Sequence, residues 1–374
     1  MSIHSRTNPF QARIKERYLL NREGASKETF HIALELDGNK LPFQVGDSIA
    51  IFPENDPKLV RSILHTLQLT GSEDLFDPRT KTTLPIVDFL RHKANLSKCT
   101  SSFLKMMKER GAEGLDDLLA PENKSRLAEC LQTHHLGDLL RIFKGSRLSA
   151  QDLTTLLPLM PRFYSIASSP RMHPEEIHLT VASLSFKAHG ETRYGVGSHF
   201  LCQMAKISET PIPLYVQPSN GFSLPEPDAS MIMIGPGTGI APFRAFLQER
   251  IALQHKGRNW LFFGERNRST DFYYSDFFLE LVKQNRLRLD LAFSRDQAEK
   301  VYVQHKLWEE RASVYEWLQS GAYLYVCGDA EKMAKDVDLT LQRIVQDQAQ
   351  MGEEDARYWL KKLRQSKHYL QDVY

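Results

Sequence analysis

Residues 231–244 constrain the fold more than any other part of the chain. Four apolar residues run into three glycines at alternate positions, Gly235, Gly237 and Gly239, and a helix-like run follows. This order predicts a buried parallel strand, a tight loop and a helix N-terminus. Such a loop favours a bound phosphate, because its N–H groups are uncovered and the helix dipole adds positive potential. The spacing differs from the common dinucleotide fingerprint G-x-G-x-x-G, whose third glycine would fall at Ile240.

The composition is that of an ordinary globular protein. The 374 residues suffice for two domains, and a net charge of +2 gives no sign of a polyanion-binding surface, so we expect no nucleic acid partner. No apolar run could span a bilayer and no signal peptide is visible, so we expect no membrane insertion. The four cysteines lie far apart without a C-x-x-C pair, which argues against a metal site and a disulfide scaffold. This pattern fits a reducing cytoplasm.

Three patterns follow one another before residue 225. Short strand-like runs occupy 10–55, helix-spaced apolar positions occupy about 56–156, and strand-like runs return over 162–224. The simplest arrangement is an antiparallel β-barrel that is interrupted by a helical insertion. Residues 225–228 then resemble a linker, because two prolines and two acidic residues stand together. We therefore expect one domain over 1–227, with the insertion at about 56–156, and a second domain over 228–374.

The second domain alternates predicted strands with predicted helices. The strands are 231–234, 259–263, 287–293 and 322–327, and the helices are 241–254, 271–285, 304–319 and 330–348. This alternation predicts an α/β fold, in which a parallel sheet carries helices on both faces. A last helix, at about 353–365, leads to the final residue, Tyr374.

Two stretches of the first domain carry side chains that suit a ligand. Arg162, Tyr164 and Ser165 share one short strand, where a guanidinium can grip a phosphate, a phenol can pack on a ring and a hydroxyl can bond a ring nitrogen. An ordinary strand end with a surface arginine is the alternative. Residues 195–198 form a glycine-flanked turn that opens a helix, which is either another anion-binding terminus or a plain loop.

A third cluster follows the predicted strand 287–293. Ser294, Arg295, Lys300 and Tyr302 offer a hydroxyl, a guanidinium, an ammonium and a phenol beyond the carboxyl end of that strand. Such a set suits a doubly charged phosphate, whereas an enzyme for NAD would place Asp or Glu there. Asp296 is close by, but two cations flank it and outweigh its charge. A solvated charged loop is the alternative.

The order of the motifs resembles that of the ferredoxin–NADP reductase-like flavoenzymes. It runs Arg-x-Tyr-Ser at 162–165, Gly-x-Gly-Ser at 195–198, Gly-x-Gly-Thr-Gly-x-x-Pro at 235–242 and Cys-Gly-Asp at 327–329. The helical insertion and the stretch 294–304 look like the diflavin reductases, and most like the flavoprotein subunit of NADPH-dependent sulfite reductase. The resemblance runs from about residue 10 to Tyr374. It implies an FAD-binding barrel followed by an NADP-binding domain.

The resemblance also implies which residues hold the two nucleotides. For FAD it assigns Arg162 to the pyrophosphate and Ser165 to flavin N5, with Ser97 as a weaker candidate. The full FAD set is Arg162, Phe163, Tyr164, Ser165, Thr180, Val181, Ala182, Phe186, Gly195, Val196, Gly197 and Ser198. The NADPH set is Gly237, Thr238 and Gly239 at the pyrophosphate, then Ser294, Arg295, Lys300, Val301, Tyr302, Val303 and Gln304 at the 2′-phosphate, and Asp336 at the border.

Four residues are implied at the reacting atoms. Ser165, Cys327 and Asp372 would meet at nicotinamide C4 and flavin N5, where they orient the hydride donor and hold developing charge. Tyr374 would cover the flavin face and move aside for the nicotinamide. Taken alone, a residue such as Cys327 is more often a buried strand-end residue, and the end of a chain such as Tyr374 usually frays.

One departure from the resemblance bears on function. Diflavin reductases begin with a flavodoxin-like FMN domain, whereas this sequence starts a few residues before its first predicted strand. We therefore expect FAD and NADPH, and no FMN. The expected activity is an NADPH reductase that passes electrons to a separate acceptor, either a flavodoxin-type FMN protein or a haem or iron–sulfur reductase, as a sulfite reductase flavoprotein-like component. The alternatives are a stand-alone NADPH–flavodoxin or NADPH–ferredoxin reductase and a non-catalytic assembly subunit.

Overall fold

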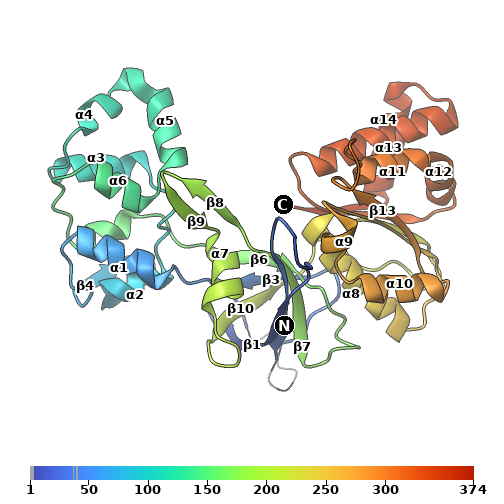
Figure 1. Cartoon of the computed structure of the whole chain (residues 1–374), viewed down its shortest axis with the longest axis horizontal. Helices are drawn as coiled ribbons and strands as arrows, with labels where there is room; N and C mark the ends of the chain where they lie inside the picture. Colours follow the sequence, from blue (N-terminus) through green and yellow to red (C-terminus); the bar gives the residue numbers. More distant parts are fainter. Residues whose placement is uncertain (1–3, 37, 39–40) are drawn as a thin grey trace. The chain divides into compact units, whose positions relative to one another are not determined.

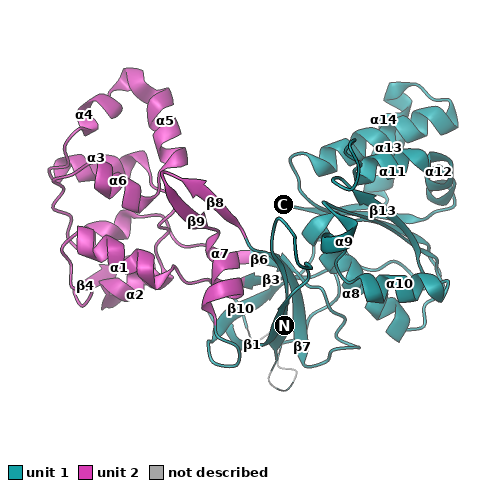
Figure 2. Ribbon diagram, viewed as in Figure 1, with its two compact units in different colours: residues 1–50, 163–183, 206–374 teal, residues 51–162, 184–205 magenta. Residues whose placement is uncertain are grey.

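The computed structural model describes residues 4–36, 38 and 41–374. These residues form two compact units, which Figure 2 distinguishes by colour. The first unit combines the described part of 1–50 with 163–183 and 206–374, and the second combines 51–162 with 184–205. The helical insertion predicted at about 56–156 lies in the second unit, and the predicted barrel strands lie largely in the first.

Six strands form the sheet of the first predicted domain. In sheet order they are β6 (Arg162–Ser165), β3 (Ser48–Ile51), β10 (Ile212–Gln217), β1 (Phe10–Leu19), β2 (Thr29–Glu35) and β7 (Glu176–Ala182). The pairs β10–β1, β1–β2 and β2–β7 are antiparallel. Just beyond β6, the Ala167 amide donates to the carbonyl of His178 on β7 at 2.8 Å. The segment after β6 therefore contacts β7, the strand at the other end of the sheet order. This arrangement confirms the predicted antiparallel barrel.

A five-stranded parallel sheet forms the C-terminal region, as the alternating pattern predicted. Its order is β13 (Arg288–Phe293), β12 (Asn259–Glu265), β11 (Met231–Ile234), β14 (Tyr323–Gly328) and β15 (Tyr369–Val373). Ile232 and Ile234 belong to one apolar core cluster, and Met231 and Met233 belong to another. Successive side chains of a strand point to opposite faces, so the four apolar residues of β11 fill the cores on both sides of the sheet.

Helices cover both faces of this sheet (Figure 1). A short 3₁₀ turn, η5 (Gly237–Ile240), leads from β11 into α8 (Ala241–Ala252). One face carries α8, α9 (Arg268–Asp271) and α10 (Ser275–Lys283). The other carries α11 (Val303–Glu309), α12 (Arg311–Gln319), α13 (Met333–Ala349) and α14 (Glu353–Gln365). Among the described residues, no helix combines the length and apolar character needed to cross a membrane.

Two predicted helices are divided in the structure. The helix predicted at 271–285 is interrupted at Tyr274, whose φ of 53° is left-handed. The Tyr274 hydroxyl lies 2.8 Å from Thr180 Oγ1 and 3.1 Å from His31 Nδ1, both on the barrel sheet. These contacts come from distant parts of the chain, and helical periodicity does not reveal them. The helix predicted at 304–319 is likewise two helices, α11 and α12, which meet at Glu310.

The edge strand β15 was not predicted. Residues 369–373 pair in parallel with β14, with Tyr369 opposite Leu324 and Asp372 opposite Cys327. Their burial does not alternate as it would in a strand with one dry face. The strand forms because β14 offers an unpaired edge, and the last residues of the chain satisfy its backbone hydrogen-bonding groups.

The second unit is mainly helical and has its own core. It contains α1 (Pro57–Thr66), α2 (Ile86–His92), α3 (Ser101–Glu109), α4 (Leu115–Leu118), η2 (Pro121–Asn123), α5 (Lys124–Thr133), α6 (Leu136–Ile142) and η3 (Gln151–Thr155). Asp56 caps α1, since its carboxylate accepts the Lys58 amide at 2.7 Å. The unit also contains a hairpin that was not predicted, β4 (Asp74–Asp77) with β5 (Thr82–Pro85), and then β8 (Ser185–Ala188), β9 (Glu191–Tyr194), α7 (Val196–His199) and the π-helical turn η4 (Phe200–Met204).

Candidate functional site

Three predicted catalytic side chains meet at the carboxyl ends of β14 and β15. Ser165, at the end of β6, donates its hydroxyl to Asp372 Oδ2 at 2.8 Å. Cys327 Sγ lies 3.9 Å from the same oxygen. Parallel pairing sets Cys327 directly opposite Asp372, so the β14–β15 register brings the thiol beside the carboxylate. The structure therefore places the Ser165 hydroxyl and the Cys327 thiol at the same carboxylate oxygen of Asp372. The roles of these groups at a nicotinamide stay a prediction.

The protonation state of Cys327 follows from its surroundings. Its side chain is fully buried. Burial, and then the charge of Asp372, raise the pKa of the Cys327 thiol well above its ordinary value. The thiol therefore stays protonated and donates to the carboxylate, and it is not a thiolate nucleophile.

Tyr374 is held in place although it ends the chain. Its amide donates to the Gly328 carbonyl at 3.1 Å, and its carbonyl accepts the Ala330 amide at 3.1 Å. Its hydroxyl lies 2.8 Å from Thr238 Oγ1, in the glycine loop. Because Tyr374 is 63% exposed, its ring remains open to a ligand that stacks on it.

The three glycines of the loop meet different physical needs. A Cβ on Gly239 would lie 2.1 Å from the Cys327 carbonyl oxygen, and one on Gly235 would lie 2.5 Å from the Gly239 carbonyl oxygen. Gly239 therefore lets the loop pack directly on the end of β14, and Gly235 lets the loop fold closely on itself. Gly237 has a φ of +60°, and a Cβ there would meet only Glu265 Oε2, at 3.9 Å. Gly237 thus permits a left-handed turn beside open space, as a close approach to a phosphate requires.

A cavity of about 750 Å³ gathers most of the predicted NADPH residues. It lies at the carboxyl ends of the sheet strands, where ligands of open α/β sheets bind. Its predicted members are Gly237, Ser294, Arg295, Lys300, Tyr302, Val303, Gln304 and Asp336. Sequence reasoning missed the others: Lys27, Pro236, Gly264, Glu265, Arg266, Ala292, Asp329, Lys332 and Met333. Five cations face three carboxylates in this lining, so the cavity favours an anion.

Some predicted NADPH residues lie outside that lining. Val301 is not part of it, Thr238 contacts Tyr374, and Gly239 packs on Cys327. Within it, Gln304 Nε2 donates to Asp336 Oδ2 at 3.3 Å. The charged members Lys27, Glu265 and Arg266 could not be found from spacing, because they come from the end of β12 and from the loop between β1 and β2.

The predicted flavin residues of the barrel lie on two strands, β6 and β7. Phe163 is exposed, and Tyr164 and Ser165 are half-buried. On β7, Val181 is buried and Ala182 is exposed. The Thr180 hydroxyl is bonded to Tyr274, so a role for Thr180 at a flavin would use its backbone. Arg162, assigned to the second unit, donates from Nη1 to the Met160 carbonyl at 2.6 Å.

The remaining flavin residues lie in the second unit, where Ser97 and Val196 line a cavity of about 300 Å³. Gly195 caps α7, and the Ser198 hydroxyl accepts the Leu184 amide at 3.1 Å and donates to the Gly195 carbonyl at 3.1 Å. These bonds hold residues 195–198 as a turn that opens the short helix. Gly197 is buried in that turn, and Phe186 is exposed on β8.

One group of described residues has the side chains of a metal site: His173, Glu176 and His178. Glu176 and His178 already form hydrogen bonds or ion pairs with each other and with neighbouring residues. His178 Nε2 lies 2.7 Å from Glu176 Oε2, His178 Nδ1 lies 3.2 Å from Arg244 Nη1, and Lys15 pairs with Glu176. Burial lowers the pKa of His178 to about 4, so that ring is neutral at physiological pH. The two adjacent cations disfavour a metal ion in this group.

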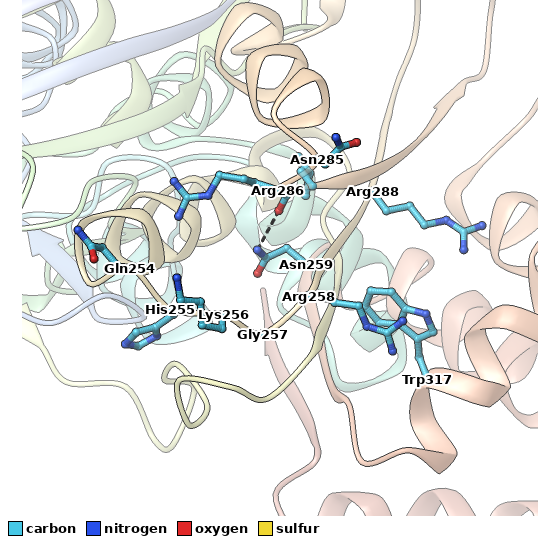
Figure 3. Close-up of a pocket in the computed structure, with 11 residues that line it drawn as sticks. Gln254, His255, Lys256, Gly257, Arg258, Asn259, Asn285, Arg286, Arg288 and Trp317 are labelled. Carbon is cyan, nitrogen blue, oxygen red and sulfur yellow. Dashed lines mark hydrogen bonds between the residues drawn. The ribbon is translucent and has the colours of Figure 1, made fainter.

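Another cavity of about 750 Å³ lies at the opposite end of the parallel strands, where β12 and β13 begin. Figure 3 shows that its basic side chains do not converge, because Arg286 and Arg288 extend in opposite directions. Arg258 lies over the Trp317 ring, 4.3 Å from its centroid, and Arg288 pairs with Glu310 at 2.5 Å. The cations of this cavity therefore do not converge on one point where a phosphate could bind. The candidate nucleotide-binding site is the cavity beside the glycine loop.

The fold and the family matches show the class: an oxidoreductase with an FAD-binding domain and a nicotinamide nucleotide domain. Residues 3–200 match the FAD binding domain family, and residues 233–338 match the oxidoreductase NAD-binding domain family. The first match covers more than half of the 374 residues, and the chain belongs to the FAD binding domain family.

Curated relatives make the resemblance more specific. The chain is 40% identical to the sulfite reductase [NADPH] flavoprotein alpha-component of Bacillus subtilis over 377 residues, with 100% of this chain and 62% of the relative covered. The proteins of the same name from Mannheimia succiniciproducens and Aliivibrio fischeri are 37% and 39% identical, with 62% and 61% of their lengths covered. The predicted resemblance is confirmed, and the chain spans about three fifths of the length of these relatives.

Proposed function

We propose that this protein is an NADPH-dependent FAD reductase that passes electrons to a separate acceptor protein. The observation that carries the proposal is the contact between Ser165, Cys327 and Asp372. This contact lies at the carboxyl ends of the parallel strands, as does the cavity beside the glycine loop, which we call the cation-lined cavity. The family matches support both nucleotides, and they fit a barrel domain over 1–227 and an NADPH domain over 228–374. Bound FAD and NADPH supply the redox chemistry, a hydride transfer from nicotinamide to flavin.

The residues at the sheet edge position the reacting rings and stabilise charge. Asp372 would hold a carboxylate beside the bound nicotinamide, where it would stabilise developing positive charge. Ser165 orients that carboxylate through its 2.8 Å hydrogen bond, and its hydroxyl can turn to a flavin nitrogen instead. The Cys327 thiol supplies a neutral donor in a dry position. Tyr374 would cover the flavin ring and keep water from it, and would leave its contact with Thr238 to make room for a nicotinamide.

The cation-lined cavity supports a preference for NADPH over NADH. Arg295 and Lys300 line it together with Ser294 and Tyr302, as expected for a 2′-phosphate site. Among the residues that the structure describes, neither Arg295 nor Lys300 forms an ion pair, so both charges are available to a ligand. Asp336 is engaged by Gln304, which keeps its carboxylate at the border of the site.

The acceptor is proposed from the names of the relatives, which are flavoprotein components of sulfite reductase. We propose a flavodoxin-type FMN protein or a haem or iron–sulfur reductase as the partner, with sulfite reduction as the overall process. A stand-alone flavodoxin or ferredoxin reductase is the second candidate, and the same sheet-edge site would serve it. The contact between Ser165 and Asp372 counts against a non-catalytic assembly subunit. The four cysteines form no disulfide, which supports the proposal that the protein acts in the cytoplasm.

The test uses the full chain. The purified protein should carry FAD, and anaerobic mixing with NADPH should bleach the flavin absorbance in milliseconds to seconds, much faster than with NADH. Ferricyanide, a flavodoxin and a haem-containing sulfite reductase subunit are then compared as electron acceptors. A protein that binds no flavin, or a flavin that NADPH does not reduce, would refute the proposed activity. Fast reduction of flavodoxin alone would favour the second candidate.

A further inference from the structure

The loop between β1 and β2 contributes two residues to the end of β12. Lys27 Nζ pairs directly with the carboxylate of Glu265, the last residue of β12. Beside that pair, Arg266 Nη1 donates to Ser26 Oγ at 2.8 Å. Lys27, Glu265 and Arg266 all line the cation-lined cavity. A loop of the barrel region thus forms part of the wall of the dinucleotide site.

Glu265 is an unexpected side chain at this place. Its side chain is 6% exposed, and its Oε2 lies 3.9 Å from the point where a Cβ on Gly237 would be. Gly237 is the turn beside which a pyrophosphate would bind. A buried carboxylate next to a phosphate raises the cost of bringing that phosphate in, because like charges repel strongly where water is scarce. Something must therefore offset the charge of Glu265 before the anion can bind.

Two groups hold Glu265 Oε2. One is Lys27, and the other is the Tyr273 hydroxyl, which donates to the same oxygen at 2.9 Å. Tyr273 is fully buried, and burial together with the Glu265 charge raises its pKa, so it remains a neutral donor. Lys27 is the only full positive charge in contact with the carboxylate among the described residues.

The contacts around Tyr273 fix the loop that carries Lys27. The Tyr273 hydroxyl lies 2.9 Å from Thr29 Oγ1, at the start of β2. Asn21, at the other end of the loop, accepts the Thr29 amide at 2.5 Å and donates to Asp271 at 2.7 Å. Residues 21 and 29 are therefore tied to the segment after β12. Because both ends of the loop are anchored, pairing Lys27 with Glu265 costs less conformational entropy than it would in a free loop.

We propose that Lys27 is a positioning residue for the dinucleotide: it neutralises Glu265 so that a pyrophosphate can bind beside Gly237. The inference rests on the proposed NADPH reductase function and extends it to a residue outside the glycine loop and the 2′-phosphate cluster. Since the pyrophosphate is common to NADPH and NADH, Lys27 should serve both nucleotides equally. This property separates it from Arg295 and Lys300.

The test compares Lys27→Met, Glu265→Gln and the double variant in the full chain. Lys27→Met should raise KM for NADPH and for NADH about tenfold each, with kcat within about twofold, because one buried charge is left uncompensated. Glu265→Gln should leave KM unchanged or lower it. The double variant should return KM to within about threefold of the wild type, since neither charge remains. A purely structural role for Lys27 would not give this rescue.

Lys15→Met is the matched control. It removes a lysine of β1 that also pairs with a glutamate, but neither Lys15 nor its partner Glu176 lines the cavity, so KM should not change. NADP⁺ binding, followed by the flavin difference spectrum, gives a readout that is independent of turnover. If Lys27→Met fails to fold, Glu265→Gln still tests the idea, because a higher KM in that variant would contradict charge neutralisation.

Two results would overturn the inference. One is an unchanged KM in Lys27→Met. The other is a loss confined to NADPH, which would place Lys27 at the 2′-phosphate. Failure of the proposed function looks different, since the wild-type protein itself would then not oxidise NADPH.

Discussion

The preference for NADPH should depend on Arg295 and Lys300, and its size follows from their surroundings. In a complex with NADPH each side chain would make a charge-assisted hydrogen bond to the 2′-phosphate, worth about 1.5–3 kcal/mol. About 1.4 kcal/mol corresponds to a tenfold change in an equilibrium constant. Both side chains are exposed, and solvent screens exposed charges, so the lower limit applies. Arg295→Ala and Lys300→Ala should each reduce kcat/KM for NADPH about tenfold.

The assay follows loss of NADPH or NADH absorbance with ferricyanide as acceptor. The NADH values should change less than about twofold, since NADH lacks the phosphate. Losses in the double variant need not add, because the two residues share one cavity. Arg268→Ala is the control, as Arg268 lies over the Phe293 ring and does not line the cavity. Equal losses for both nucleotides, or no loss, would refute the assignment of this cluster to a 2′-phosphate.

Three further predictions follow from the same structure. Asp372→Asn should slow flavin reduction by NADPH about 10- to 100-fold in stopped-flow mixing with little change in NADP⁺ affinity, because it removes charge that acts in the transition state; weaker binding with an unchanged rate would contradict this role. Deleting Tyr374 should raise the NADH/NADPH ratio of kcat/KM, since a nicotinamide would no longer displace its ring, and an unchanged ratio would argue against stacking. Burial lowers the pKa of His31 to about 2, so the unfolded chain binds protons more readily than the folded one. The free energy of unfolding should therefore fall as pH drops below about 6.5. The urea midpoint of His31→Gln should depend less on pH between about 6.5 and 4 than that of the wild type, and an equal slope in both proteins would refute this.

The strands and helices with clear periodicity were predicted from sequence. The run 231–234 is β11, its glycines form the loop that follows, and a helix capped by Asp56 begins the region of helix-spaced apolar positions. These features depend on interactions within a few residues, such as side-chain alternation, turn geometry and capping bonds. The cluster Ser294, Arg295, Lys300 and Tyr302 also needed only one strand end to bring it together.

Features that depend on distant partners were not predicted. Strand β15 exists because it completes the edge of β14, and its own residues carry no strand pattern. The break at Tyr274 follows from hydrogen bonds to Thr180 and His31 on another sheet. Lys27 lies in a loop whose sequence gives no sign of a nucleotide site, and only its contact with Glu265 places it there.

The sequence by itself determined the two fold classes, the glycine loop and the chemical types of the site residues, because these are written in local spacing. It also carried the family resemblance, through motifs that keep their order along the chain. The tertiary structure alone decided which side chains meet. Ser165 and Asp372 are 207 residues apart, and they share a hydrogen bond because β6 ends where β15 pairs with β14. The pairing of Lys27 with Glu265 likewise depends on a barrel loop reaching the end of a parallel strand, and no local pattern encodes such a contact.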